Sequence, residues 1–293
     1  MIYEGHEDKK GNAMRYKSIF RPDLFDGQTI VVTGGGSGIG RAAAHELASL
    51  GAHVVLAARK AARLEQVRDE IAAAGGSASA HVCNIRDEEQ VAALFETVLA
   101  ERGAVHGLFN NGGGQFISPA EQITLKGWQA VVETNLTGTF LMCREAFNRF
   151  MGAHGGSIVN MLIDCWRGYP GMAHSAAARA GVEILTRTLA VEWARAGVRI
   201  NAVAPGVIRS SGLETYGEAA RPLIEQSRQD IPAKRLGTES EVAAAVTFLL
   251  SPAAAYISGA TLKIDGASAL WRKTWEIADH DQAPPAFHGF VEE

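Results

Sequence analysis

A glycine-rich run lies early in the chain, between a short apolar stretch and a longer segment with helical periodicity. It reads Thr33-Gly34-Gly35-Gly36-Ser37-Gly38-Ile39-Gly40. Glycines permit a tight turn here and let backbone N–H groups approach a pyrophosphate at the N-terminus of the following helix. The spacing Gly-x-x-x-Gly-x-Gly differs from the common dinucleotide fingerprint Gly-x-Gly-x-x-Gly. Its place between a strand and a helix still predicts a dinucleotide site, formed by Gly34, Ser37, Gly38, Ile39 and Gly40.

The residues after the second expected strand indicate which dinucleotide binds. A site for NAD usually has Asp or Glu at this point, where the carboxylate binds the ribose hydroxyls. The stretch Val54-Val55-Leu56-Ala57-Ala58-Arg59-Lys60 contains no acid. Arg59, helped by Lys60 and Ser37, can instead supply donors to a 2′-phosphate. We therefore expect NADP(H) rather than NAD as the cofactor.

The elements that must position these residues alternate along almost the whole chain. Short β-branched runs, separated by helical segments, are typical of βαβ units in a parallel sheet. We expect strands at Gln28–Val32, His53–Ala57, Ser79–Cys83, Gly107–Asn110, Ser157–Met161, Arg199–Val203 and Thr261–Ile264. We expect helices at Gly38–Leu50, Ala61–Ala74, Asp87–Arg102, Pro119–Phe150, Ser175–Ala196 and Ser240–Leu250.

Without internal repeats or a Pro/Gly-rich linker, this pattern predicts one α/β domain over residues 1–293, with a doubly wound parallel sheet of about seven strands and helices on both faces. Two segments interrupt the alternation. Residues 206–237 have the character of a long substrate loop. Residues 271–293 form a tail without a clear period, which could wrap a subunit surface.

The composition excludes several classes of protein. The 293 residues include 28 Lys and Arg against 32 Asp and Glu, for a formal charge of -4, and are 47% hydrophobic. This balance is typical of a soluble globular protein and gives no basic field for nucleic acid. No run reaches the roughly 18 apolar residues of a membrane span, and residues 1–21 are too polar for a signal peptide. Three widely spaced cysteines (Cys83, Cys143, Cys165) lack metal-ligand spacing, so we expect free thiols, no metal and a cytoplasmic location.

Further motifs make the chain resemble the short-chain dehydrogenase/reductase family over roughly residues 25–270. They are Asn110-Asn111-Gly112-Gly113, Thr134-Asn135-Leu136-Thr137-Gly138 and Pro205-Gly206. The resemblance implies a single Rossmann-type domain, usually a homotetramer, with a nicotinamide cofactor along the C-terminal edge of the sheet. It also implies a catalytic role for Asn135, and it adds to the cofactor site Asn84, Ile85, Asn111, Gly112, Gly113, Pro205, Gly206, Val207 and Ile208.

The usual catalytic residues of that family are missing. The family pattern is a Ser after the fifth strand and Tyr-x-x-x-Lys on the next helix, where the Tyr passes a proton to a carbonyl and the Lys lowers its pKa. These positions hold Leu162, Ser175 and Arg179. A Ser hydroxyl is a far weaker acid than a phenol, and Arg stays protonated. Ser175 and Arg179, one turn apart, can still donate to the nicotinamide ribose and to a substrate oxygen that becomes negative.

Such donors suit conjugate reduction, in which hydride adds to a β-carbon and a thioester oxygen carries enolate charge until the α-carbon is protonated. Residues 111–121, 174–182, 204–208, 231–235 and 275–281 are similar to the peroxisomal trans-2-enoyl-CoA reductase branch of the family, which is related to 2,4-dienoyl-CoA reductases. This similarity implies an NADPH-dependent reductase of 2-enoyl-CoA thioesters. The final Val291-Glu292-Glu293 is not a peroxisomal address, so the compartment does not carry over.

The proton donor and the CoA contacts have several candidates. Tyr169, Asp164 on the same loop, and a water held by Asn135 are possible donors, and Asp164 would need its pKa raised by burial. We expect an apolar pocket wall from Phe116, Trp166 and Met172, and a structural role for His174. Basic candidates for CoA contact are Arg167, Arg209, Lys234 and Arg235.

Two other functions stay open. One is an NADP-dependent dehydrogenase of an alcohol or ketone, such as a hydroxyacyl-CoA or a terpenoid. The other is a non-catalytic NADPH-binding protein, since all three standard catalytic positions have changed. Turnover of hydroxyl compounds alone would select the first, and cofactor binding without hydride transfer would select the second.

Overall fold

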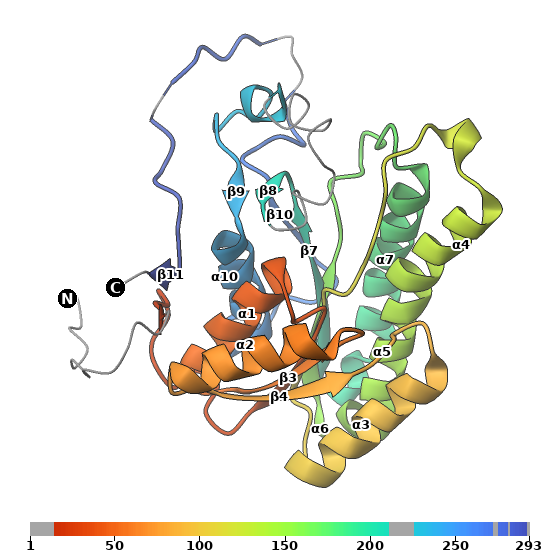
Figure 1. The fold of residues 1–293 in the computed structure, drawn as a ribbon, viewed down its shortest axis with the longest axis vertical. Coiled ribbons are helices and arrows are strands. Elements are labelled where there is room, and N and C mark those ends of the chain that lie inside the picture. Colours follow the sequence, from red (N-terminus) through yellow and green to blue (C-terminus); the bar gives the residue numbers. More distant parts are fainter. Residues whose placement is uncertain (1–14, 211–225, 272–274, 281, 292–293) are drawn as a thin grey trace.

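The computed structural model describes residues 15–210, 226–271, 275–280 and 282–291. Seven parallel strands form one sheet in the order β10-β7-β6-β5-β2-β3-β4, which confirms the predicted doubly wound sheet (Figure 1). The strands are β2 (Thr29–Thr33), β3 (His53–Ala58), β4 (Ser77–Val82), β5 (Gly107–Asn110), β6 (Gly156–Met161), β7 (Val198–Pro205) and β10 (Thr261–Ile264). Each predicted strand is present, with ends shifted by at most two residues.

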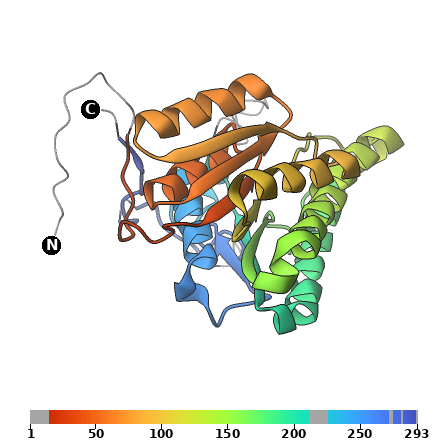
Figure 2. The same cartoon turned by 90° about the horizontal axis from the view of Figure 1, so that it is seen from below.

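Helices cover both faces of the sheet (Figures 1 and 2). On one face lie α1 (Gly38–Ser49), α2 (Ala61–Ala73) and α10 (Glu239–Leu250). On the other lie α3 (Glu88–Arg102), α4 (Leu125–Val132), α5 (Gly138–Ala146), α6 (Gly152–His154) and α7 (Ala173–Glu192). Two large hydrophobic clusters fill the two sides. Every residue of β2 is buried because this central strand has a helical layer on each face.

The long helix predicted over Pro119–Phe150 is wrong as a single element. A short 3₁₀ turn, Ala120–Gln122, comes first, and Thr124 then caps α4 by accepting a hydrogen bond from the Gly127 N–H. Two π-helical turns, Glu133–Thr137 and Phe147–Met151, interrupt the remainder. The apolar periodicity continues through a π turn, so the sequence did not reveal these breaks.

The strand order sets the position of the site. β2 lies between β3 and β5. From β3 the strands continue toward one edge of the sheet, and from β5 they continue toward the other edge. In an open α/β sheet, ligands bind beyond the carboxyl ends of the strands at such a switch point. The glycine-rich turn after β2 and the Asn111–Gly113 turn after β5 meet there.

The described part of the C-terminal tail ends against the start of the same chain. β11 (Phe290–Val291) pairs antiparallel with β1 (Arg15–Tyr16) (Figure 1). The structure therefore gives the tail a partner within its own chain. A second small pair is parallel and joins β8 (Ile208–Arg209) to β9 (Gly237–Thr238), within the expected substrate loop. Residues 211–225 of that loop lie outside the described residues.

No helix in the described ranges has the length and apolar character needed to cross a bilayer. The three cysteines are free thiols, and the described residues contain no group of three or more potential metal ligands.

Candidate active site

The glycine-rich turn and the turn after β5 are joined by hydrogen bonds. The Asn111 Nδ2 donates to the Thr33 carbonyl at 3.0 Å, and the Gly112 N–H donates to the Thr33 hydroxyl at 2.8 Å. Gly34 has a φ of +67°, a conformation that favours glycine. A Cβ on Gly40 would lie 2.3 Å from the Gly34 carbonyl oxygen. The close backbone packing explains these glycines and leaves the first turn of α1 facing the switch point, as a dinucleotide cradle requires.

The basic residues after β3 lie beside this turn. Gly36 packs against the start of α2, since a Cβ on Gly36 would lie 3.0 Å from the Arg63 Cβ. Arg59 and Lys60 precede that helix, are exposed, and form no ion pair with any residue in the described ranges. Ser37 is the N-cap of α1, and its hydroxyl makes no capping hydrogen bond. The predicted donors for a 2′-phosphate are thus gathered around one turn.

Ile85 packs against the turn after β5. It is buried, and a Cβ on Gly112 would lie 3.1 Å from its Cδ1. Asn84 is half-buried, and its Oδ1 lies 3.4 Å from the Arg86 N–H. The Asn84 backbone N–H donates to Gln90 at 3.0 Å. These contacts fix Asn84 at the carboxyl end of β4, on the side where the adenine of a dinucleotide would lie.

Asn135 lies in the first π turn and holds the loop after β5. Its Oδ1 accepts a hydrogen bond from the Gly114 N–H at 2.9 Å, and its Nδ2 donates to the Gly114 carbonyl at 3.1 Å. The side chain is 1% exposed. The amide therefore clamps a loop, a contact that the sequence did not predict, and π turns commonly occur at functional sites.

Arg179 is a buried cation beside this clamp. Its Nη1 donates to the Met161 carbonyl at 2.6 Å, and a Cβ on Gly113 would lie 2.3 Å from its Nη2. The residue is 5% exposed, its Nε has no hydrogen-bond partner, and no described carboxylate forms an ion pair with it. Burial lowers the pKa of Arg179 to about 10, so the guanidinium remains charged at neutral pH.

Ser175, one turn before Arg179, points to a different partner. Its hydroxyl donates to the Gln115 Oε1 at 2.6 Å, and its backbone N–H donates to the His174 Nδ1 at 2.8 Å. His174 is fully buried, and its ring lies edge to face with Phe116 at a centroid distance of 4.3 Å. Gln115 was not singled out as a site residue, although it lies within the motif at residues 111–121; only the fold brings it to Ser175.

The loop after β6 carries the proton-donor candidates. Leu162 is buried in the position where the family has Ser, and Met172 is also buried. Burial, and then the charge of Asp265, raise the pKa of Asp164 above its ordinary value. Tyr169 is half-buried, and its carbonyl accepts a hydrogen bond from the Met172 N–H at 3.0 Å. Trp166 is exposed and lies under the Lys263 ammonium, which is 4.1 Å from its ring centroid.

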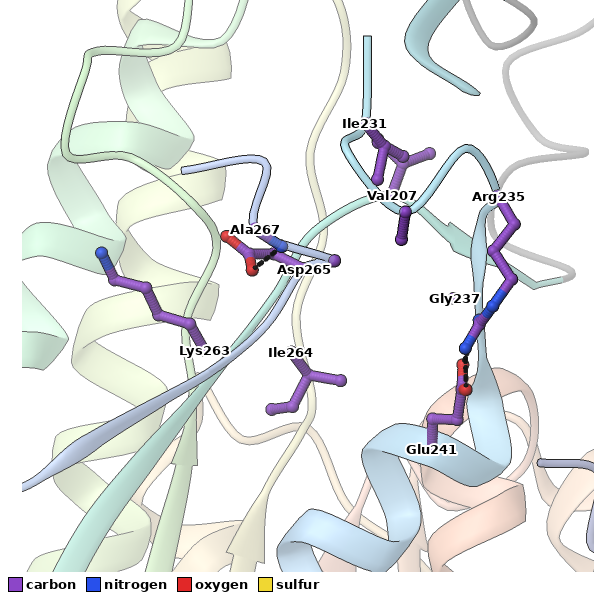
Figure 3. Close-up of a pocket in the computed structure, with 11 residues that line it drawn as sticks. Val207, Ile231, Arg235, Gly237, Glu241, Lys263, Ile264, Asp265 and Ala267 are labelled. Atoms are coloured by element: carbon purple, nitrogen blue, oxygen red, sulfur yellow. Dashed lines mark hydrogen bonds and ion pairs between the residues drawn. The ribbon is translucent and has the colours of Figure 1, made fainter. Parts of the chain in front are cut away.

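The turn after β7 borders a cavity of about 310 Å³ (Figure 3). Pro205 ends β7, and Gly206 packs against Asp265, since a Cβ on Gly206 would lie 2.9 Å from the Asp265 Cβ. The Val207 carbonyl accepts a hydrogen bond from the Gly237 N–H at 3.1 Å. Ile208 is buried and pairs with Gly237 in the small β8–β9 ladder. The fold thus commits the Val207 carbonyl to a partner within the protein.

The four basic candidates for CoA contact separate into different environments. Arg235 is held by Glu241 through two contacts of 2.7 and 3.0 Å, drawn in Figure 3. Arg167 donates to the Trp271 carbonyl. Arg209 is exposed in β8, and Lys234 lines a second hollow with Asp279 and His280. The sequence could not distinguish them because their partners are distant in the chain.

Comparisons with known proteins agree with this geometry. The family model for enoyl-(acyl carrier protein) reductase matches residues 34–267. A Bacillus subtilis protein, "Probable 2,4-dienoyl-CoA reductase", (2E)-enoyl-CoA-producing, is 39% identical over 82% of this chain and 95% of its own length. These matches confirm the predicted resemblance to the short-chain dehydrogenase/reductase family.

Two solved structures are similar to this chain in sequence and fold. The citronellol catabolism dehydrogenase AtuB of Pseudomonas aeruginosa is 58% identical, with a TM-score of 0.79 over 87% of this chain and 100% of that one. A Beutenbergia cavernae chain that was solved with bound NADP at low occupancy is 37% identical, with a TM-score of 0.79 over 85% and 99% of the two chains. Both share the fold of this chain.

Proposed function

Because the chain belongs to the short-chain dehydrogenase/reductase family, we propose that it uses NADPH to reduce the C=C bond of a trans-2-enoyl-CoA thioester. The observation that carries this proposal is the buried guanidinium of Arg179 in place of the family's Lys. This guanidinium has no carboxylate partner among the described residues and an Nε without a hydrogen bond. A buried charge without an opposite charge beside it costs several kcal/mol. That cost is offset when negative charge develops beside it, as on the oxygen of a thioester enolate.

The cradle fits a dinucleotide with a 2′-phosphate. Gly34 and Gly40 allow the turn to pack closely at the start of α1, and Arg59, Lys60 and Ser37 offer donors beside it. Asn84, Ile85, the turn at residues 111–113 and residues 205–208 complete the proposed contacts along the sheet edge. When bound, the reduced nicotinamide supplies the hydride that the β-carbon accepts.

The chain's own residues then manage the charge and the geometry. Arg179 stabilises the negative oxygen or the nicotinamide ribose through its remaining N–H groups. Asn135 holds Gly114, and so fixes the loop that ends in Gln115. Ser175 directs its hydroxyl proton to Gln115, so a substrate oxygen that accepts from Ser175 must displace this contact. Neither Ser175 nor Arg179 is suited to remove a proton from an alcohol.

For the proton to the α-carbon we favour Asp164 over Tyr169 and over a water held by Asn135. A carboxylic acid donates only while it is protonated, and burial together with the Asp265 charge raises the pKa of Asp164. Asp265 lies directly against Gly206, in the turn proposed to hold the nicotinamide. Asp265 was not among the predicted site residues.

A second candidate function is oxidation of a terpenoid alcohol. The 58% identity to the Pseudomonas protein, which is named for citronellol catabolism, favours it. In that case Asp164 or Tyr169 would act as the base. We further propose a cytoplasmic homotetramer that acts on a small molecule, rather than on nucleic acid or a membrane.

The first experiment follows NADPH absorbance after addition of a medium-chain trans-2-enoyl-CoA, with the matching 3-hydroxyacyl-CoA or citronellol and NADP⁺ in parallel. We expect oxidation of NADPH by the enoyl thioester alone. Turnover of a hydroxyl compound alone would select the dehydrogenase. Binding of NADPH without any turnover would select a binding protein.

Replacement of Arg179 by Ala tests the observation behind the proposal. We expect kcat to fall on the order of a hundredfold, as when an oxyanion donor is lost. Arg179→Lys keeps the charge and should recover part of the rate. The exposed Arg68, on α2, gives a control in Arg68→Ala. A wild-type kcat in Arg179→Ala would remove this residue from the site.

A further inference from the structure

A second hollow, of about 450 Å³, is lined by Arg228, Gln229, Lys234, Asp279 and His280. Three of these residues come from residues 226–235, and the other two come from the C-terminal tail. The same segment contributes Ile231, Ala233 and Arg235 to the cavity beside the turn after β7. One segment of chain therefore borders both the proposed nicotinamide end of the site and an outer hollow.

Among the described residues that line the hollow, basic side chains outnumber acidic ones. The basic residues are Arg228, Lys234 and His280, and the His280 Nε2 lies 3.0 Å from the Pro232 carbonyl oxygen. Asp279 is the acid among the described lining residues, and its side chain is 98% exposed. Its carboxylate lies 3.6 Å from the Lys234 Nζ, which is too long for a strong pair and leaves Asp279 free to turn into solvent.

Lys234 is held at this hollow by an uncommon backbone conformation. Its φ is +54°, in the left-handed region that a non-glycine residue seldom adopts. Its side chain is only 13% exposed, its Nζ donates to the Gln229 carbonyl at 3.1 Å, and the Nζ lies 5.8 Å from the Trp271 ring centroid. Strained residues of this kind often belong to ligand sites.

We propose that this hollow binds the phosphorylated nucleotide end of the acyl-CoA thioester. This inference rests on the proposed function. Phosphates match the basic side chains of Arg228 and Lys234 that line the hollow. The volume is within the range of small-molecule sites, roughly 300–1,000 Å³. Residues of the same segment, 226–235, line both this hollow and the cavity beside the turn after β7.

The sheet order separates this hollow from the cofactor site. The glycine-rich turn and Arg59 follow β2 and β3, whereas the hollow is built by segments that follow β7 and β10 at the other edge. A ligand in the hollow and a dinucleotide at the glycine-rich turn would therefore occupy separate places along the sheet edge. Among the basic residues suggested by the sequence, Lys234 alone lines this hollow, while Arg235 is committed to Glu241.

Calorimetric titration of 3′,5′-ADP into the full chain saturated with NADPH tests the site directly. The NADPH occupies the cofactor site, so the heat reports a second site. We expect Lys234→Gln to weaken binding at least tenfold, and Asp279→Asn to tighten it severalfold because an opposing charge is removed. Lys126→Gln, an exposed lysine on α4, is the matched control. Pantetheine, which lacks the nucleotide, should give no comparable heat.

Opposite effects of the two charge changes support the site, and equal affinities of Lys234→Gln, Asp279→Asn and wild type overturn it. Absence of 3′,5′-ADP binding to the wild type also overturns it. NADPH affinity of each variant shows whether it has folded.

Turnover separates this inference from the proposed function. We expect kcat/KM for an enoyl-CoA to exceed that for the matching enoyl-pantetheine, and Lys234→Gln to reduce this ratio about tenfold. Equal kcat/KM for the two thioesters would keep the function and overturn the site. No reduction of either thioester, combined with 3′,5′-ADP binding that shows the expected charge effects, would overturn the function and keep the site.

Discussion

At the scale of single residues, charge decides what the proposed site can do. The family pattern pairs a phenol with an ammonium group, whereas this chain pairs a hydroxyl with a buried guanidinium. A phenol and a Lys can share a proton with substrate, but a Ser hydroxyl and a guanidinium keep their protons near neutral pH and act through hydrogen bonds. The same residues that weaken an alcohol dehydrogenase reaction therefore favour stabilisation of an enolate.

Cofactor preference is predicted to depend on Arg59. Because Arg59 is exposed beside the glycine-rich turn and has no ion-pair partner among the described residues, Arg59→Asp should repel a 2′-phosphate. We expect NADPH binding to weaken at least tenfold and NADH binding to change little, measured by fluorescence titration. Arg68→Ala, on helix α2 that follows Arg59, serves as control. Equal losses for both cofactors would argue against a phosphate contact.

The proton donor is predicted to leave a signature in the pH profile. If Asp164 must be protonated, kcat falls as pH rises through its elevated pKa. Asp164→Asn should abolish this decrease of kcat with pH, the limb of the profile, and should lower kcat at least tenfold. Tyr169→Phe should retain the limb. The reverse pattern, in which Tyr169→Phe loses activity and Asp164→Asn keeps the limb, would assign the proton to the phenol. Rates measured from pH 5 to 9 distinguish the two.

At the scale of elements, two local features hold the site together. The π turn directs Asn135 toward Gly114, so the helix that follows α4 is coupled to the loop after β5. The β1–β11 pair couples the two ends of the chain to α1, where the Arg41 guanidinium lies 4.4 Å from the Phe290 ring centroid. The cofactor turn opens that same helix, so the tail supports the site indirectly.

Gly289 is predicted to be essential to this tail contact. A Cβ on Gly289 would lie 2.2 Å from the Tyr16 Cζ, and the Gly289 N–H donates to the Ser240 hydroxyl at 3.0 Å. Gly289→Ala should therefore separate the tail from the body of the protein and cost about 1–3 kcal/mol, as overpacked cores do. Thermal unfolding measures the loss. An unchanged melting temperature would show that the tail does not stabilise the fold.

At the scale of the whole molecule, the buried acid Glu46 makes stability depend on pH. Glu46 lies on α1 beneath the β1–β11 pair, where it accepts a hydrogen bond from Ser18, and burial raises its pKa. A carboxyl with a raised folded-state pKa contributes its stability below the unfolded pKa and loses it as pH rises through the folded pKa. The nearby Tyr16 and His45 are also shifted toward their neutral forms, by burial.

Glu46→Gln should remove this dependence. We expect the variant to gain free energy of unfolding relative to the wild type as pH rises from about 4 to 8, by about 1.4 kcal/mol for each unit that burial adds to the pKa. Denaturant titrations at several pH values measure the difference. Glu65→Gln, an exposed acid on α2, is the control. A difference between Glu46→Gln and wild type that stays constant with pH would contradict a buried neutral acid.

The order of strands has the widest consequence. It brings the turns after β2 and β5 together at the switch point, and it places the segments after β7 and β10 at the other side. A nucleotide cofactor and a nucleotide-bearing substrate would then approach from different sides of one sheet edge. This separation is what the 3′,5′-ADP titration in the presence of NADPH exploits.

The sequence by itself determined the strands of the seven-stranded sheet and the residue types of the glycine-rich turn. Strand and helix periodicity, glycine spacing and the absence of an acid before Arg59 are local signals, because they depend on neighbours along the chain. The seven strands and the doubly wound sheet followed from them. The changed catalytic positions at Leu162, Ser175 and Arg179 were equally visible in the sequence.

Only the tertiary structure decided which of these residues meet. Gln115 accepts a hydrogen bond from Ser175, which lies 60 residues later in the chain. Glu241 forms an ion pair with Arg235, and Asp265 packs against Gly206. The two π turns and the pairing of β11 with β1 also lack a local signal. The physical reason is that hydrogen bonds and ion pairs depend on distance in space. Strand order and loop packing set those distances, and neither is written in the spacing of nearby residues.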